Sequence, residues 1–72
     1  MIMYAVPSPG DILWQDLNEE AQNHEVRVDH DEEVVIGSAD ELANFFRALD
    51  GPGQSFPIVE FLEWIEDYKL VQ

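Results

Sequence analysis

Two neighbouring segments of the chain, 24–28 and 32–37, are the clearest strand candidates, because Val26 and Val28 alternate with Arg27 in the first, and Val34 and Ile36 share one side in the second. Alternation with a period of two is typical of a β-strand that has one buried face. The polar residues 29–32 between the segments contain neither the Asn-Gly nor the Asp-Gly pair of a two-residue turn, so we expect a loop of about four residues. The pattern therefore predicts a β-hairpin over about 25–37.

The residues before the hairpin predict one strand and one element that can be a helix or a strand. Residues 1–6 are apolar and predict a short buried strand that ends at Pro7. Over roughly 9–22, apolar residues recur every four positions, and Ser8 stands where a helix cap belongs, which favours a helix. The alternative is a strand over 11–17, where Ile12 and Trp14 would alternate with Leu13 and Gln15, so the pattern leaves helix and strand open. The recurring apolar positions are Leu13, Leu17 and Ala21.

Two further helices are predicted from serine caps and apolar stripes. Ser38 begins a capping box, in which its hydroxyl accepts the N–H of Glu41 and the Glu41 carboxylate reaches back to the helix start. A helix is expected from there to about Leu49. Ser55 is expected to cap a last helix that runs to about Lys69. The stripe of the first of these helices comprises Leu42, Phe45, Phe46 and Leu49.

The last helix separates apolar from acidic residues when it is drawn at about 100° per residue. Trp64 lies at the boundary between the two faces. The apolar face comprises Ile58, Phe61, Leu62, Ile65 and Tyr68, and the acidic face comprises Glu60, Glu63, Glu66 and Asp67. The apolar faces of the two helices predict a shared core. Its expected members are Leu42, Phe46, Phe61, Leu62 and Ile65.

These elements predict an α+β fold, in which an N-terminal strand and a β-hairpin pack against two to three short helices. With 72 residues, one domain over 1–72 is expected. The chain has no cysteine, so neither a disulfide nor a thiolate zinc site can stabilise it. Its stability must come from packing, with or without a partner or a second copy.

The chain is strongly acidic. It contains 16 Asp and Glu residues against three Lys and Arg, which gives a formal net charge of -13. This lies far outside the magnitude of about 2–8 that suits a small soluble domain. Binding to nucleic acid or to an anionic membrane requires cationic groups, so neither is an expected direct partner. The expected partner is a basic protein, one that itself binds nucleic acid, because spaced carboxylates imitate phosphates.

Two acidic clusters and one aromatic residue are the predicted partner-binding residues. Within the last helix, Glu60, Glu63 and Asp67 are about 4.5 and 6 Å apart along the axis, which is close to the spacing of phosphates. Trp64 borders this stripe and has the position of an interface anchor. The full predicted set is Asp29, Asp31, Glu32, Glu33, Glu60, Glu63, Trp64 and Asp67.

Metal binding and catalysis are weaker interpretations of the same residues. The segment around His30 imitates the start of a calcium loop, but Val34 occupies the sixth position, where glycine is required. A solvated hairpin loop explains these acids without a metal. The serines have capping positions that explain them, and no phosphate-binding loop or cysteine nucleophile is present. We therefore expect no metal, no cofactor and no enzymatic activity.

In size, lack of cysteine and acidic character the chain resembles small phage-encoded inhibitors of bacterial defence, the anti-CRISPR and anti-restriction proteins. Several members of that class mimic DNA. The resemblance rests on no motif, so it assigns no residue. It implies an inhibitor, monomeric or homodimeric, of a defence nuclease or surveillance complex. An immunity or antitoxin protein against a basic toxin, and an adaptor that binds through Trp64, are the alternatives.

The expected location is the cytoplasm, that of the host cell if the protein is phage-encoded. The first residues are too short for a signal-peptide core, and no basic region precedes them. No apolar run approaches the length of a transmembrane helix.

Overall fold

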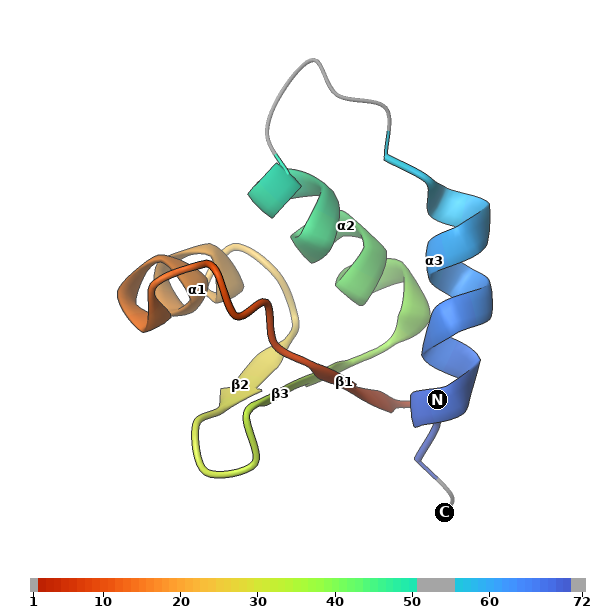
Figure 1. Cartoon of the computed structure of the whole chain (residues 1–72), viewed down its shortest axis with the longest axis horizontal. Helices are drawn as coiled ribbons and strands as arrows, with labels where there is room; N and C mark the ends of the chain where they lie inside the picture. The colour runs from red at the N-terminus through yellow and green to blue at the C-terminus, as the bar shows by residue number, and fades with distance from the viewer. Residues whose placement is uncertain (1, 51–55, 71–72) are drawn as a thin grey trace.

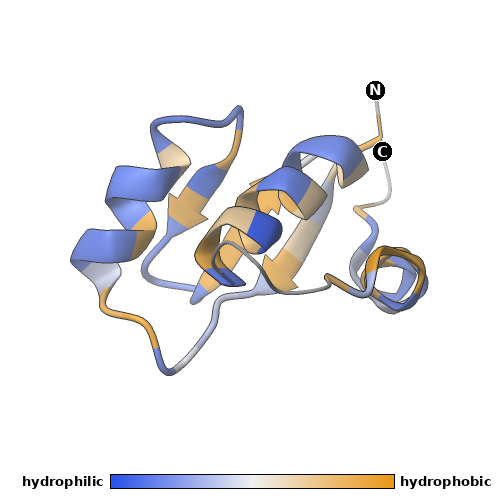
Figure 2. Ribbon diagram, turned by 90° about the horizontal axis from the view of Figure 1, so that it is seen from above, coloured by the Kyte–Doolittle hydropathy of each residue, from blue (hydrophilic) through white to orange (hydrophobic). Residues whose placement is uncertain are grey.

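A computed structural model describes residues 2–50 and 56–70 of the chain. Its three strands form one antiparallel sheet in the order β1-β3-β2. Figure 1 and Figure 2 show α2 lying over the sheet, with α1 on one side of it and α3 on the other. The predicted α+β fold is confirmed. The elements are β1 (Tyr4–Pro7), α1 (Trp14–Ala21), β2 (Arg27–Asp29), β3 (Val34–Gly37), α2 (Ala39–Asp50), α3 (Ile58–Ile65) and the short 3-10 helix η1 (Glu66–Tyr68).

The predicted hairpin is present as β2 and β3. Its connecting loop comprises residues 30–33, one position later than expected, because Asp29 still pairs with Val34. Val35, in the central strand β3, pairs with Val6 of β1 on one side and with Val28 of β2 on the other. Val6 and Val35 are fully buried, so this face of the sheet supports the core.

The first helix is shorter than predicted. Residues 9–22 were expected to be helical, but α1 begins only at Trp14. The strand alternative over 11–17 is wrong for the same residues. Ser8 does not cap this helix; its backbone N–H instead donates to the carbonyl oxygen of Glu33 at 3.0 Å, which holds the chain against the hairpin loop.

The late start of α1 changes which residues are buried. Leu13 is the residue before the helix, makes no side-chain cap, and is 73% exposed. Leu17 is 1% exposed and is the one residue of α1 that is buried. The predicted stripe is therefore wrong at Leu13 and correct at Leu17.

The start of α2 confirms half of the predicted capping box. The Ser38 hydroxyl accepts the backbone N–H of Glu41 at 3.4 Å. The Glu41 carboxylate does not reach back to the helix start; it accepts the backbone N–H of Glu25 at 2.7 Å. Glu41 therefore joins α2 to the segment that leads into β2.

The last helix has an end that the sequence did not predict. Helix α3 ends at Ile65, and η1 continues the chain to Tyr68, where one α-helix to about Lys69 was expected. Ser55, the expected cap, lies outside the described residues. After η1, the N–H of Leu70 donates to the carbonyl oxygen of Met3 at 2.9 Å. The chain therefore returns alongside β1.

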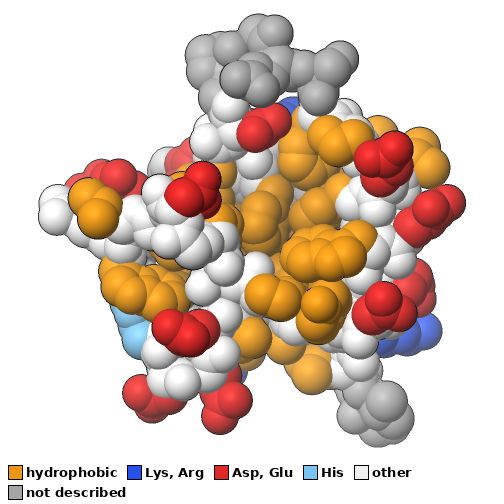
Figure 3. All heavy atoms as spheres, in the orientation of Figure 1, with side chains coloured by type: hydrophobic (Ala, Val, Ile, Leu, Met, Phe, Trp, Pro, Cys, Tyr) orange, Lys and Arg blue, Asp and Glu red, His pale blue; other side chains and the backbone are white. Residues whose placement is uncertain are grey.

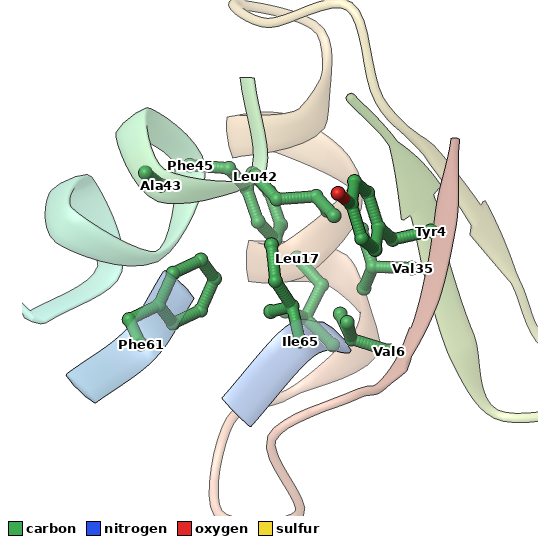
Figure 4. Packing of buried hydrophobic residues seen from close by; sticks show 9 residues of the cluster. All are labelled: Tyr4, Val6, Leu17, Val35, Leu42, Ala43, Phe45, Phe61 and Ile65. Atoms are coloured by element: carbon green, nitrogen blue, oxygen red, sulfur yellow. The ribbon is translucent and has the colours of Figure 1, made fainter. Parts of the chain in front are cut away.

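The core lies between the sheet and the helices, as Figure 4 shows. The predictions for Leu42, Phe61 and Ile65 are confirmed, whereas Phe46 is only half-buried. The prediction for Leu62 is wrong, because its side chain is 37% exposed. The buried apolar residues are Tyr4, Val6, Leu17, Val35, Leu42, Ala43, Phe45, Phe61 and Ile65.

Candidate protein-binding surface

One carboxylate of the hairpin cluster shapes the loop in which the cluster lies. The Asp29 side chain accepts two backbone N–H groups, those of Asp31 at 3.0 Å and Glu32 at 3.1 Å. This is the side-chain-to-backbone bonding that stabilises tight turns. Glu33 closes the loop with a φ of 56°, in the left-handed region. Asp31, Glu32 and Glu33 are exposed, so these three carboxylates remain free for an electrostatic role.

Both histidines pack against aromatic rings. The His30 ring lies 4.6 Å from the Trp14 ring between centroids, with an interplanar angle of 49°. The His24 and Phe45 rings are 5.9 Å apart between centroids and nearly perpendicular, at an interplanar angle of 85°. Within residues 2–50 and 56–70, no group of three or more His, Asp and Glu residues could hold a metal ion. Through these contacts His30 joins the hairpin loop to α1, and His24 joins the segment between α1 and β2 to α2.

The second acidic cluster follows the outer side of α3. Glu60, Glu63 and Asp67 are all exposed. Glu60 and Glu63 belong to α3, whereas Asp67 lies in η1, where the rise per residue is larger. The axial distance from Glu63 to Asp67 is therefore about 7 Å rather than the 6 Å expected for a continuous α-helix.

Glu66 has a different environment from the rest of the acidic face. It accepts a hydrogen bond from the Tyr4 hydroxyl at 3.3 Å. Burial, and then the charge of the Glu66 carboxylate and this hydrogen bond, raise the pKa of Tyr4 above its usual value of 10.0. Glu66 thus contributes to the junction between η1 and β1 rather than to the α3 cluster.

Trp64 is partly exposed and is held by neighbouring aromatic rings. Its side chain is 40% exposed. The ring lies 5.9 Å from Phe61 and 5.2 Å from Tyr68 between centroids, the second in an edge-on arrangement. Glu60 precedes Trp64 by four residues and Asp67 follows it by three, so both lie next to it on the helix surface. The structure therefore joins the predicted aromatic anchor to two of the predicted acids.

An apolar groove of about 650 Å³ opens beside Trp64. It lies between α3, the later turns of α2 and the linker from β1 to α1. Figure 3 shows apolar side chains gathered on this face, with acidic side chains on either side of them. The lining residues are Pro7, Ser8, Pro9, Asp11, Ile12, Phe46, Leu49, Asp50, Phe56, Pro57, Phe61 and Trp64.

The eight predicted residues do not form one site. The hairpin loop lies on the α1 side of the molecule, and α3 lies on the opposite side (Figure 1). The molecule measures 34 × 28 × 20 Å, so a single large partner can still contact both clusters. The structure brings together Glu60, Glu63, Trp64 and Asp67 and places the hairpin cluster apart from them.

The groove itself was not identified from the sequence. Phe46 and Leu49 were interpreted as parts of a core stripe, although both are only half-buried. The one signal in the sequence is the width of the apolar stripe on α2, which comprises Leu42, Phe45, Phe46 and Leu49. Which of them remain uncovered depends on where α3 packs, and no local pattern encodes that position.

No helix in residues 2–50 and 56–70 has the length and apolar character needed to cross a membrane. No protein-family model matches the chain, and no similar protein is found among curated sequences or solved structures.

Proposed function

We propose that this protein is a non-enzymatic inhibitor that binds the basic nucleic-acid-binding surface of another protein and excludes the nucleic acid. One observation carries the proposal, the placement of the charge. The formal net charge is -13, and no charged side chain in the described part of the chain is buried. The acids therefore face solvent or a partner, where complementary charge speeds association and selects basic surfaces.

Repulsion among the acids destabilises the folded protein, and a basic partner relieves this repulsion. Like charges at this density repel one another and oppose the compact state. A surface rich in lysine and arginine relieves this repulsion when it binds, and nucleic acid competes for the same cationic groups. The resemblance to small anti-defence proteins makes bacterial defence nucleases and surveillance complexes the first partners to test. This proposal places the protein in the cytoplasm, where those complexes act.

The test compares three variants that each remove three charges from a different element, namely α3, the hairpin loop and α1. The α3 variant carries Glu60→Gln, Glu63→Gln and Asp67→Asn. The hairpin variant carries Asp31→Asn, Glu32→Gln and Glu33→Gln, and it keeps Asp29 because that carboxylate shapes the loop. The control variant on α1 carries Asp16→Asn, Glu19→Gln and Glu20→Gln. Each changes the formal net charge from -13 to -10, since three of the 16 acids are neutralised.

The parent protein is used to capture partners from a bacterial lysate at low salt, and mass spectrometry identifies them. Affinity for the captured protein is then measured for all variants from low to high salt, with DNA or RNA as competitor. We expect binding that weakens steeply with salt, competition with nucleic acid, and a larger loss for the α3 variant than for the α1 control. Simultaneous binding of nucleic acid and this protein, or affinity independent of salt, would contradict the proposal.

A second candidate function is a protein-binding adaptor, which the exposed Trp64 and the adjacent groove favour. Adaptor binding through apolar contacts depends little on salt, so the same salt series separates the two functions. An inhibitor of a basic toxin would show the same salt dependence. It is distinguished by a captured partner that does not bind nucleic acid.

A further inference from the structure

The groove beside Trp64 has two walls of different origin. Phe46 and Leu49 from the later turns of α2 form one wall, and Phe61 and Trp64 from α3 form the other. The Phe46 and Phe61 rings are 5.3 Å apart between centroids, so the two helices meet at the base of the groove. The walls are therefore attached to the core and hold the shape of the groove without a ligand.

Trp64 is positioned as the anchor of this groove. Its contacts with Phe61 and Tyr68 restrict the ring, while 40% of the side chain remains exposed. A rigid, partly exposed tryptophan at the edge of an apolar pocket is the kind of residue that contributes most to protein interfaces.

The charges around the groove decide what it can accept. Asp11 and Asp50 line it, and Glu60 and Asp67 lie next to Trp64 on the helix surface. The guanidinium of Arg47 lies 6.0 Å from the ring centroid of Phe56, which also lines the groove, so these four acids outnumber this cation. An occupant that carries lysine or arginine beside its apolar residues is attracted by this rim. A second copy of this chain is repelled, because each copy has a formal net charge of -13. Charge complementarity therefore favours a basic partner over self-association.

We propose that this groove binds a short segment of the basic partner, in which large apolar side chains are flanked by lysine or arginine. The apolar side chains enter between Phe46, Leu49, Phe61 and Trp64, and the cations pair with the acidic rim. This inference rests on the proposed function for the charge of the partner, but it adds a specific contact that charge alone does not provide. The groove supplies selectivity among basic surfaces, and the remaining acids supply the attraction.

The first test uses three synthetic peptides labelled with fluorescein, and fluorescence anisotropy as the readout. The probe peptide has a central pair of leucines flanked by lysines on both sides. One control replaces the leucines by serine and keeps the charge, and the other replaces the lysines by glutamate and keeps the apolar pair. We expect the probe peptide to bind at least about tenfold more tightly than either control.

The second test uses two protein variants that are matched in exposure and lie on opposite flanks of α3. Trp64→Gln removes the proposed anchor, and Leu62→Gln changes a side chain that is 37% exposed but does not line the groove. We expect Trp64→Gln to weaken probe binding by at least about tenfold and Leu62→Gln to change it by less than about twofold. Circular dichroism checks that both variants keep the helical signal of the parent.

The location of binding is tested with Trp14→Phe, which leaves Trp64 as the only tryptophan. Binding of the probe peptide is expected to shift the fluorescence of this protein and to move the amide resonances of Phe46 and Leu49. If the variants are too unstable to compare, these two signals alone decide, because they need neither Trp64→Gln nor Leu62→Gln. Peptide binding that leaves both signals unchanged would place the site elsewhere and overturn the inference.

Three outcomes separate this inference from the proposed function. Equal affinity for the probe and the serine peptide contradicts apolar binding in the groove, whereas the proposed electrostatic inhibition is unaffected. Failure of every peptide to bind, while the whole partner still competes with nucleic acid, does the same. A dimer in sedimentation that Trp64→Gln dissociates shows that a second copy occupies the groove, and this also overturns the inference.

Discussion

Three neighbouring positions of α3 are expected to differ sharply in their contribution to stability. Phe61 is 8% exposed, Leu62 is 37% exposed and Val59 is 66% exposed. Truncation of each residue to alanine therefore removes a different amount of buried apolar surface from one helix. Since the helix and its charges are common to the three variants, the comparison isolates the orientation of α3 against the core.

The expected cost is about 3–5 kcal/mol for Phe61→Ala, the range for a buried phenylalanine. Its ring lies 5.3 Å from Phe46, 5.3 Å from Phe56 and 5.9 Å from Trp64 between centroids. Aromatic pairs of this kind add about 0.5–1.5 kcal/mol each beyond burial, which places the cost near the upper end. The 72 residues, at about 0.05–0.15 kcal/mol each, give a total stability of about 4–11 kcal/mol, so Phe61→Ala removes much of it.

The two exposed positions are expected to cost much less. A fully buried leucine contributes about 1.5–3 kcal/mol, and Leu62 is partly exposed, so Leu62→Ala is expected to cost about 1–2 kcal/mol. Val59→Ala is expected to stay within about 0.5 kcal/mol of the parent. If Phe61→Ala does not fold, Phe61→Leu keeps most of the apolar volume and is expected to cost about 1–2 kcal/mol.

Urea unfolding followed by circular dichroism measures these free energies, at one ionic strength because salt alters the repulsion among the acids. The expected order of destabilisation is Phe61, then Leu62, then Val59. Equal losses at Phe61 and Leu62 would refute the orientation of α3, and with it the assignment of Trp64 to the groove.

Two further predictions concern the helix cap and the response to alkaline pH. Ser38→Ala is expected to lower the free energy of unfolding by about 0.5–1 kcal/mol, because the Ser38 hydroxyl accepts the backbone N–H of Glu41. Ser8→Ala is expected to cost less than about 0.5 kcal/mol in the same urea assay, because Ser8 bonds to Glu33 through its backbone. Equal costs for the two variants would contradict these roles. The pKa of Tyr4 is raised in the fold, so its neutral form contributes stability that is complete below about pH 10 and is lost as the pH rises further. Between pH 9 and about pH 12, the melting temperature is expected to fall more steeply for the parent than for Tyr4→Phe, which has no phenol beside Glu66. Equal falls in the melting temperature of the two proteins would contradict this.

Local patterns were sufficient where one short segment carried its own structural signal. The alternation in 24–28 and the valine-rich segment 32–37 predicted the hairpin, and Ser38 predicted the start of α2. The prediction was wrong at Ser8, although the same serine-cap reasoning was applied. The backbone N–H of Ser8 donates to the carbonyl oxygen of Glu33, which is far away in the sequence, so Ser8 lies against the hairpin loop rather than at the start of α1.

The candidate site shows the same division between local and long-range information. The sequence located Trp64 at the edge of an acidic stripe, because both depend only on the phase of one helix. It could not separate Phe61 from Leu62 as core residues, since they are adjacent on that helix and the choice depends on where the helix rests. It also could not show that the hairpin acids and the α3 acids lie on opposite sides of the molecule.

The sequence by itself determined the net charge, the absence of cysteine, the hairpin and the helix that follows Ser38, because composition and short-range periodicity encode them directly. The tertiary structure decided that α3 packs against α2 along Phe61 and Ile65, leaving Phe46 and Leu49 half-buried and Trp64 at the edge of a groove. The physical reason is that a helix buries only the side facing its neighbour. Which side that is depends on the sum of contacts between distant segments, and no single segment contains that sum.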